Sequence, residues 1–501
     1  MNYLLGIDLG TSSLKTIVLS QDGWILGSEA IDYQFDSPVQ GYAEQDPAVW
    51  WDACVNTIKI AVRRADVSTE DIKAVGFSGQ MHGVVMLDRD YRVIRPAILH
   101  CDARSEEQVE RLNSMIPLET RQRLFRNPVY PGFMLTSLLW MRDEEPENFE
   151  RIAHVCSPKD YIRYLLTGVF SSEYSDASAT LLFDIEENHW SDEILSLTGL
   201  PRGIFPDCTE PTAAVGCITA AAAEITGLST KTLVTAGGGD LTMMAVGNGM
   251  VRNGDGILNI GTSGQVSFQI DQPVINPALN TNMFSSYHSG RWVLYGATMS
   301  AGLCLKWWRQ STGNPSYELV NDLVAKAGPG SGGVIFYPYL NGERCPHLMS
   351  DISSCFLGVN ASTGYGEMTR AVMEGVVFNL RQCAEVCGKL GFTANTYLAS
   401  GGAARSDNWT QIMADIFNKP VKRVIGEEQA CLGAALCAGV GAGYWGSIPE
   451  AADAIVRYQD RIIEPIPQNA AVYEEYYEIF RDTFPMFSAN LRKLTNLGRR
   501  K

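Results

Sequence analysis

Two short segments built around glycine, about half a chain apart, constrain the fold of this sequence most strongly. Residues 6–15 read GIDLGTSSLK and residues 259–264 read NIGTSG. Each segment follows or ends a short apolar run, turns on glycine, and presents Thr and Ser hydroxyls. A strand, a glycine turn and a returning strand gather backbone N–H groups into a concave nest that suits phosphate oxygens. The repeat therefore predicts two related α/β domains with a cleft between them.

The two glycine turns are expected to face each other and to hold one nucleoside triphosphate from both sides. Only the first turn carries an acidic residue, Asp8. Because Mg²⁺ keeps most of its water shell and takes few protein carboxylates, we expect Asp8 to hold Mg²⁺ through water.

Length, charge and cysteine usage narrow the class of protein. A chain of 501 residues is too long for one core and suits two domains with an appendage. The formal net charge of −16 argues against nucleic acid, whose binding needs a basic face. The opening MNYLLGIDLG lacks a basic n-region, and the uncharged residues 431–446 fall short of the roughly 20 apolar residues of a membrane span. With 12 scattered cysteines and no CxxC pair, we expect reduced thiols in a cytoplasmic protein without membrane or nucleic-acid partners.

The predicted elements repeat along the chain. Apolar and alternating runs, and one run of helical periodicity, predict a β-β-β-α-β order typical of the ribonuclease H-like fold. These elements cover residues 3–8, 14–19, 24–32, 47–64 and 72–78. The pattern is expected to return in a second domain that opens with a strand at residues 233–236. Its further strands are predicted at residues 256–261, 265–270 and 292–295, with a helix from Ser300.

The end of the chain is predicted to be an amphipathic helix. Within residues 472–497, the side chains of Phe480, Phe484, Phe487 and Leu491 share one helical face, which favours docking onto the body of the protein. The expected domains are residues 1–232 and 233–465, followed by this C-terminal helix within residues 466–501.

Asp240 is the strongest candidate for a catalytic group. It ends the run GGGD, where a predicted strand gives way to a helix. A carboxylate there could simply cap the helix. Three consecutive glycines are costly for a cap alone, and we expect them to clear space for a ligand. Ligands gather at the carboxyl ends of strands in open α/β sheets, so Asp240 is expected to accept the proton of a substrate hydroxyl as that oxygen attacks a γ-phosphorus.

Two further glycine-rich segments are candidates for ligand contact. The segment SGQMHG, residues 78–83, follows a strand and is expected to face the same cleft, where the flanking glycines weaken a purely structural reading of His82. The segment SGGAAR, residues 400–405, lets a flat ring approach the backbone and is a candidate adenine and ribose site. A tight strand-to-helix turn explains it equally well.

Taken together, these motifs resemble the FGGY carbohydrate kinases, and within that family the bacterial xylulokinases. The resemblance covers nearly the whole chain, and the shared order and spacing of the motifs make it specific. It is carried by GIDLGTSSLK, AEQDPAVWW, SGQMHG, RPAIL, SPKDYIRYLLTG, AGGGD, GTSG, PYLNGERCP, ASGGAARSD and the Gly433–Ala435 turn.

The resemblance implies two actin-like, ribonuclease H-like domains that close around sugar and ATP at an interdomain cleft. It assigns Asp240 as the catalytic base, Met81 and His82 as sugar-contacting residues, and Asp8 as the residue associated with Mg²⁺. The nucleotide-contacting positions that it implies are Thr11, Ser12, Lys15, Thr262, Gly302, Lys306, Gly402 and Ser406.

Three positions depart from the family pattern, and all concern the sugar. Leu241 follows the catalytic Asp where an amide is usual, His100 stands where Trp is expected, and Ser137 replaces a common Lys. An apolar wall cannot reward a hydroxyl as a hydrogen-bonding group does. Both Leu241 and His100 are therefore expected to border the sugar and to influence which sugar binds.

The resulting interpretation is an ATP-dependent kinase for the terminal hydroxyl of a ketopentose, with D-xylulose converted to D-xylulose 5-phosphate. Alternatives are a kinase of another ketose, a deoxyketose or a polyol, and an actin-like or chaperone-like ATPase. The expected ligands are a small sugar, ATP and Mg²⁺, and a homodimer is compatible with the sequence.

Overall fold

The first domain is built on a mixed sheet in the computed structural model, which describes residues 2–498. The strand order is β13-β14-β5-β1-β2-β3, and β15 pairs with the end of β5. β1, β2 and β3 are antiparallel, whereas β5 and β14 continue the sheet in parallel. The strands are β1 (Tyr3–Leu9), β2 (Ser13–Ser20), β3 (Ile25–Asp32), β5 (Ile72–Gly79), β13 (Ala214–Cys217), β14 (Leu233–Thr235) and β15 (Gly238–Gly239).

The second domain repeats this arrangement with the strand order β18-β19-β17-β16-β22-β23. β16, β17 and β19 are antiparallel, and β22 and β23 continue in parallel, so the predicted duplication of a ribonuclease H-like unit is confirmed. The strands are β16 (Gly256–Ile260), β17 (Gly264–Ile270), β18 (Asn282–Ser285), β19 (Trp292–Thr298), β22 (Tyr397–Ser400) and β23 (Val421–Arg423).

One predicted strand belongs to the other sheet. Residues 233–236 were expected to open the second domain, but β14 pairs with β5 and β13 in the first sheet. The expected boundary between residues 232 and 233 therefore falls inside the first sheet. The glycine-rich residues after this strand resemble the start of a new domain, but local sequence does not reveal which strand is the pairing partner.

Helices cover both sheets, and local signals explain where they begin. In α1 (Pro47–Ala65), Asp46 accepts a hydrogen bond from the Ala48 N–H at 2.9 Å and Pro47 occupies the first turn. The main helices of the second domain are α11 (Gly302–Ser311), α12 (Tyr317–Ala327), α13 (Tyr365–Lys389) and α14 (Asp407–Phe417). The first domain also contains α6 (Pro158–Thr167), α7 (Tyr174–Ser178) and α9 (Ala220–Thr226), and α16 (Ile448–Ile455) precedes the C-terminal helix.

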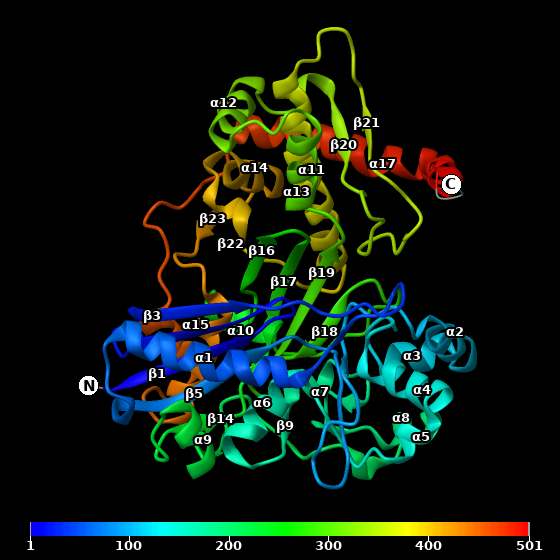
Figure 1. The fold of residues 1–501 in the computed structure, drawn as a ribbon. Helices are drawn as coiled ribbons and strands as arrows, with labels where there is room; N and C mark the ends of the chain where they lie inside the picture. Colours follow the sequence, from blue (N-terminus) through cyan, green and yellow to red (C-terminus); the bar gives the residue numbers. More distant parts are fainter. Residues whose placement is uncertain (1, 499–501) are drawn as a thin grey trace.

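Two helices cross at the junction of the domains (Figure 1). α10 (Asp240–Gly247) follows the first sheet but packs Leu241 and Ala245 among side chains of the second sheet. α15 (Gln429–Gly441) follows the second sheet but lies on β1 and β5, where a Cβ at Gly6 or Gly76 would overlap its backbone carbonyls. Gly433, expected in a turn, lies inside α15.

Gly433 and Gly247 explain how closely α10 and α15 approach. A Cβ on Gly433 would overlap the carbonyl oxygen of Met243, and a Cβ on Gly247 would overlap that of Gln429. Through this crossing, each domain rests on a helix that follows the sheet of the other domain.

Shorter elements extend both domains. These helices are α2 (Glu106–Met115), α3 (Leu118–Leu124), α4 (Met134–Glu144), α5 (Pro146–Glu150) and α8 (Asp192–Thr198). The short strands are β4 (Glu44–Gln45), β6 (Val85–Leu87), β7 (Ala97–Ile98), β8 (His154–Cys156), β9 (Ser172–Glu173), β10 (Phe183–Asp184), β11 (His189–Trp190) and β12 (Cys208–Thr209) in the first domain, with β20 (Ile335–Tyr337) and β21 (Cys355–Leu357) in the second.

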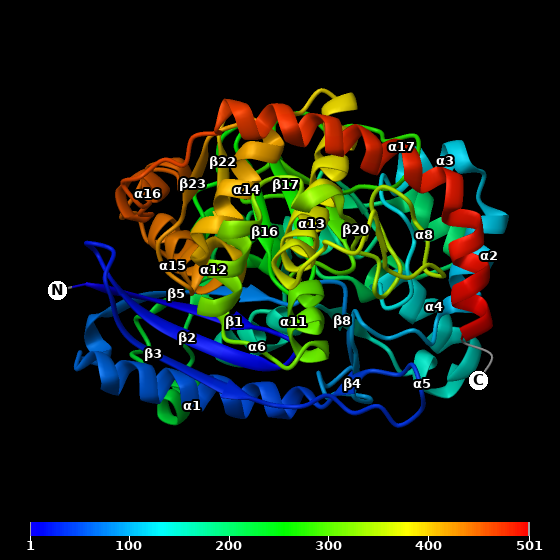
Figure 2. The same cartoon turned by 90° about the horizontal axis from the view of Figure 1, so that it is seen from above.

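The last helix of the described residues is α17 (Pro467–Gly498), which runs along the outer side of the second domain (Figure 2). Its buried residues include Phe480, Phe484 and Leu491, as the sequence predicted, together with Tyr473 and Tyr477. Among the helices within residues 2–498, none combines the length and the apolar character that crossing a membrane requires.

Candidate active site

Asp240 lies where the first sheet meets the second domain. β15 places Gly238 and Gly239 beside Ser78 and Gly79 of β5, and α10 begins at Asp240. The carboxylate accepts a hydrogen bond from the Leu241 N–H at 2.7 Å. The start of a helix favours a negative charge at this position.

The three glycines before Asp240 serve protein packing, which corrects the expectation that they clear space for a ligand. A Cβ at Gly237, where φ is +72°, would overlap the Phe77 carbonyl. A Cβ at Gly238 would lie 2.6 Å from Cε of Met243, and one at Gly239 would lie 2.6 Å from Cγ of Met81. The glycines thus bring the backbone against neighbouring segments and so fix where Asp240 stands.

The surroundings of Asp240 suit a proton acceptor. Its side chain is open to solvent, but protein surrounds it deeply enough that desolvation, followed by the negative charge of Asp8, raises its pKa to about 7. A general base works best when its pKa lies near the operating pH.

Asp8 occupies the end of β1, between Lys15 of β2 and Ser78 of β5. Desolvation raises its pKa, although the neighbouring Ser78 hydroxyl and the charge of Lys15 oppose that effect. Its Oδ1 atom is buried and has no protein hydrogen-bond partner. Such an orphaned acceptor suits a water or a hydrated cation.

The geometry of His82 identifies its free nitrogen. The residue has φ of +72°, its ring stacks on Phe133 at 4.0 Å between centroids, and burial lowers its pKa to about 3. Nδ1 lies 2.8 Å from the Ala179 carbonyl, which can only accept, so the neutral ring carries its proton on Nδ1. Nε2 is therefore left as an acceptor for a ligand hydroxyl.

The other predicted sugar-side residues differ in their surroundings. Met81 and Leu241 are buried in one apolar cluster, and Leu241 is only 8% exposed. His100 is exposed, and desolvation followed by the charge of Arg344 lowers its pKa. Ser137 is fully buried in α4.

Three residues near these side chains were missed by sequence reasoning. The positive charge of Arg344 contributes to the lowered pKa values of both His82 and His100. Its guanidinium lies 5.7 Å from the ring centroid of Tyr130. Burial raises the pKa of Tyr295, while the charge of Arg344 opposes this rise and the charge of Asp240 adds to it. The motif PYLNGERCP contains Arg344 and could have signalled it, whereas Tyr130 and Tyr295 carry no distinctive motif.

The predicted nucleotide residues of the second domain come together in one pocket of about 600 Å³. Its lining includes Thr262, Gly302, Lys306, Gly402 and Ser406. The pocket is partly apolar, with Leu303, Tyr317, Met373 and Trp409 also contributing, which suits a nucleobase.

Residues of the first glycine turn lie outside the lining of that pocket. The Thr11 hydroxyl donates to Gln80 Oε1 at 3.2 Å, and Ser12 is exposed. The Lys15 Nζ atom pairs with Glu428 Oε2 at 2.7 Å across the two domains and lines a neighbouring pocket of about 570 Å³. Gly402 borders both pockets.

Among residues 2–498, no three His, Cys, Asp or Glu side chains gather as a metal centre would require.

Comparisons with known proteins agree with this geometry. Residues 3–247 match the N-terminal domain and residues 256–442 the C-terminal domain of the FGGY family of carbohydrate kinases. The xylulose kinase of Bacillus subtilis is 34% identical over 485 residues, covering 97% of each chain. The crystal structure of xylulose kinase from Rhodospirillum rubrum has a TM-score of 0.91 at 27% identity and covers 98% of this chain and 100% of that one. Gluconate kinase from Lactobacillus acidophilus has a TM-score of 0.93 at 25% identity, with 98% and 99% covered.

Proposed function

Because the chain belongs to the FGGY family of carbohydrate kinases, we propose that it transfers the γ-phosphoryl group of ATP to the terminal hydroxyl of D-xylulose. The observation that carries the chemistry is Asp240, a carboxylate in the cleft whose pKa is raised to about 7. The substrate follows from the xylulose kinases to which the chain is similar over nearly its whole length.

Asp240 accepts the proton of the sugar hydroxyl as that oxygen attacks the γ-phosphorus. The neutral ring of His82 orients the sugar, because its Nε2 is free to accept from a second hydroxyl. Met81 packs against Gly239 and supplies an apolar wall beside the base. Catalysis of this kind depends chiefly on positioning and on stabilising charge.

ATP is proposed to bind with its adenosine part in the pocket of about 600 Å³. Thr262 and Gly302 would approach the phosphates from the second domain, and Thr11 and Ser12 from the first. Lys15 would reach them only if its ion pair with Glu428 opens.

Asp8 is the residue that fits Mg²⁺, since its Oδ1 is buried without a protein partner. Bound with the nucleotide, Mg²⁺ would neutralise charge on the phosphates during transfer. Asp8 would contact the ion through water molecules of the hydration shell.

A different ketose or a deoxyketose is the second candidate substrate, and Leu241 favours it. This side chain follows the base and lies in the apolar cluster with Met81, so it offers no hydrogen bond to a sugar hydroxyl. An actin-like or chaperone-like ATPase would not need a sugar for turnover.

Coupled measurement of ADP release tests these candidates. D-Xylulose, D-ribulose, 1-deoxy-D-xylulose, D-gluconate and glycerol would each be supplied with ATP and Mg²⁺. We expect the highest kcat/KM for D-xylulose, with the product identified as the 5-phosphate by ³¹P NMR. A higher kcat/KM for another compound would replace the substrate, and ATP turnover unaffected by every sugar would overturn the kinase proposal.

A further inference from the structure

A cluster of charged side chains lies fully buried behind the glycine turn that precedes Asp240. We call it the Lys159 cluster, and it consists of Lys159, Asp160, Arg163, Glu173 and Asp176. We propose that Ser175, supported by this cluster, is a positioning residue that holds the backbone of Gly239 and thereby fixes the catalytic Asp240. The inference rests on the proposed function, because it takes Asp240 to be the base.

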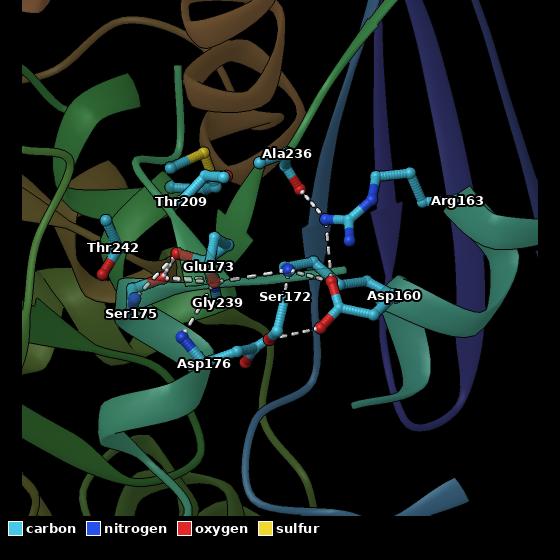
Figure 3. A network of polar contacts seen from close by, with 12 residues as sticks. Asp160, Arg163, Ser172, Glu173, Ser175, Asp176, Thr209, Ala236, Gly239 and Thr242 are labelled. Carbon is cyan, nitrogen blue, oxygen red and sulfur yellow. Dashed lines mark hydrogen bonds and ion pairs between the residues drawn. The ribbon is translucent and has the colours of Figure 1, made fainter. Parts of the chain in front are cut away.

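The link from the cluster to Gly239, the residue before the base, is a short chain of hydrogen bonds (Figure 3). The Gly239 N–H donates to Ser175 Oγ at 2.9 Å. The Ser175 hydroxyl in turn donates to the carboxylate of Glu173, whose Oε2 lies 2.8 Å away. Since Gly239 directly precedes Asp240, any shift of this amide moves the base.

Glu173 is itself held from several directions. It accepts hydrogen bonds from the Ser175 N–H at 2.7 Å and the Asp176 N–H at 2.8 Å, so it caps α7. Its Oε1 lies 3.3 Å from Nζ of Lys159. Because the Glu173 carboxylate is fixed in this way, the Ser175 hydroxyl donates its hydrogen in one direction only. A lone pair of Ser175 Oγ then faces the Gly239 N–H.

The rest of the cluster ties this part of the first domain together. Nζ of Lys159 pairs with Asp160 Oδ1 at 2.7 Å and with Asp176 Oδ2 at 3.0 Å. Arg163 Nη1 lies 2.9 Å from Asp160 Oδ1 and donates to the Ala236 carbonyl at 2.7 Å, just before the glycine run (Figure 3). The cluster therefore holds the segment that leads to Asp240 at Ala236 and at Gly239.

The charges of the cluster balance if Asp176 carries a proton. Three carboxylates face two cations, all wholly buried, and an uncompensated charge in such a place is strongly unfavourable. Burial raises the pKa of Asp176 well above its usual range, while the Lys159 charge opposes this and that of Glu173 adds to it. Asp160, which contacts both cations, has a lowered pKa in spite of its burial.

Ser178 provides a matched control in the same helix. Its hydroxyl donates to the Ser175 carbonyl at 2.7 Å and accepts from the Ser285 N–H of β18 at 3.0 Å. Like Ser175 it is buried and joins α7 to another strand, but it does not contact the turn before Asp240. Ser178→Ala thus removes a comparable buried hydroxyl without touching Gly239.

The test compares Ser175→Ala with Ser178→Ala in steady-state assays with ATP, Mg²⁺ and D-xylulose. Ser175→Ala is expected to lower kcat by roughly 10- to 100-fold, because small displacements of a reacting group are costly. It should also shift the acid limb of the kcat pH profile, with KM for ATP unchanged. Ser178→Ala should lower the unfolding midpoint similarly but keep the wild-type pH profile.

Equal kcat values and pH profiles for the two variants would overturn the positioning role. If Ser175→Ala does not fold, Glu173→Gln takes its place, since it weakens the acceptor of the Ser175 hydroxyl. Wild-type kcat in that variant would overturn the proposal equally. Asp240→Asn separates the two levels: if it keeps wild-type activity the base assignment fails, whereas its inactivity beside a fully active Ser175→Ala defeats only the positioning role.

A second pair tests the charge balance. Asp176→Asn should unfold at a temperature close to that of the wild type, because a neutral amide replaces a protonated carboxyl. Asp160→Asn should unfold much earlier, since it leaves Lys159 and Arg163 with one partner charge too few. Equal loss of stability in both variants would show that Asp176 is ionised.

Discussion

Asp8 and Asp240 approach one point from opposite sides of β5. Asp8 pairs with Ser78 on one side of that strand, and Gly238, two residues before Asp240, pairs with Ser78 on the other. Desolvation and then the charge of Asp8 raise the pKa of Asp240. A cation bound beside Asp8 would reduce that repulsion, so metal binding and ionisation of the base are expected to be coupled.

Replacing the base should affect turnover more than binding. Asp240→Asn is expected to lower kcat by roughly 10²–10⁴-fold, the usual scale for loss of a general base, while ATP binding measured by calorimetry stays nearly unchanged. A variant that keeps more than about a third of wild-type kcat would remove Asp240 from this role.

The pH dependence of activity should report the same carboxylate. Asp240 must be ionised to accept a proton, so kcat/KM is expected to fall about tenfold per pH unit below an apparent pKa of about 7. Because folding raises this pKa from 3.8, the folded protein loses stability as pH rises from 3.8 to about 7, and the loss is complete above 7. Asp240→Asn should therefore unfold at a higher temperature than the wild type at pH 8, with little difference at pH 4.

Asp8 can be tested through Mg²⁺ and through pH together. Asp8→Asn is expected to raise the Mg²⁺ concentration for half-maximal activity by roughly tenfold or more. It should also move the acid limb of kcat/KM to lower pH, because it removes a charge that raises the pKa of Asp240. Unchanged Mg²⁺ dependence would mark Asp8 as a residue of the turn only.

The helix crossing should tolerate no side chain at Gly433. Gly433→Ala places a Cβ against the backbone of Met243 and is expected to cost about 1–3 kcal/mol or more, as overpacking does. Gly388→Ala in α13 is the matched control, because its Cβ would meet only Thr393 Cγ2 at 3.7 Å. The control should gain up to about 1 kcal/mol in helix stability. Denaturant unfolding of both variants decides the matter, and equal midpoints would refute the close approach.

Leu241 is expected to influence which sugar binds. Losing one hydrogen bond to a neutral hydroxyl costs about 0.5–1.5 kcal/mol, so an apolar residue here favours a sugar with a hydrogen, a methyl group or a differently oriented hydroxyl nearby. If the preferred sugar is not D-xylulose, Leu241→Asn should raise kcat/KM for D-xylulose relative to that sugar. Leu241→Val serves as an apolar control. If D-xylulose is already the best substrate and Asn only weakens it, the altered-specificity idea is wrong.

Periodicity and glycine patterns were sufficient to predict the repeated α/β architecture. The strands around both glycine turns, the helix after Asp46 and the apolar face of the C-terminal helix all lie within a few residues of their predicted places. These features depend on contacts between residues that are close in sequence, or on one apolar face of an element. Both can therefore be recognised from a short stretch of sequence.

The candidate site could be predicted only where a motif carried it. Asp8, His82 and Asp240 stand in glycine-rich segments typical of a turn at a strand end, whereas Tyr130 and Tyr295, which lie near Arg344, come from segments with no such pattern. Their contribution arises because residues far apart in the chain converge.

Only the tertiary structure decided which partner each segment has. The strand at Leu233–Thr235 joins the first sheet, Gly433 packs inside a helix, and the glycines before Asp240 accommodate Phe77, Met243 and Met81 rather than a ligand. The Lys159 cluster likewise draws its members from separate elements. Local sequence fixes the conformations a segment favours, but burial, charge balance and close backbone approach depend on what lies across from it, and that is a property of the folded chain.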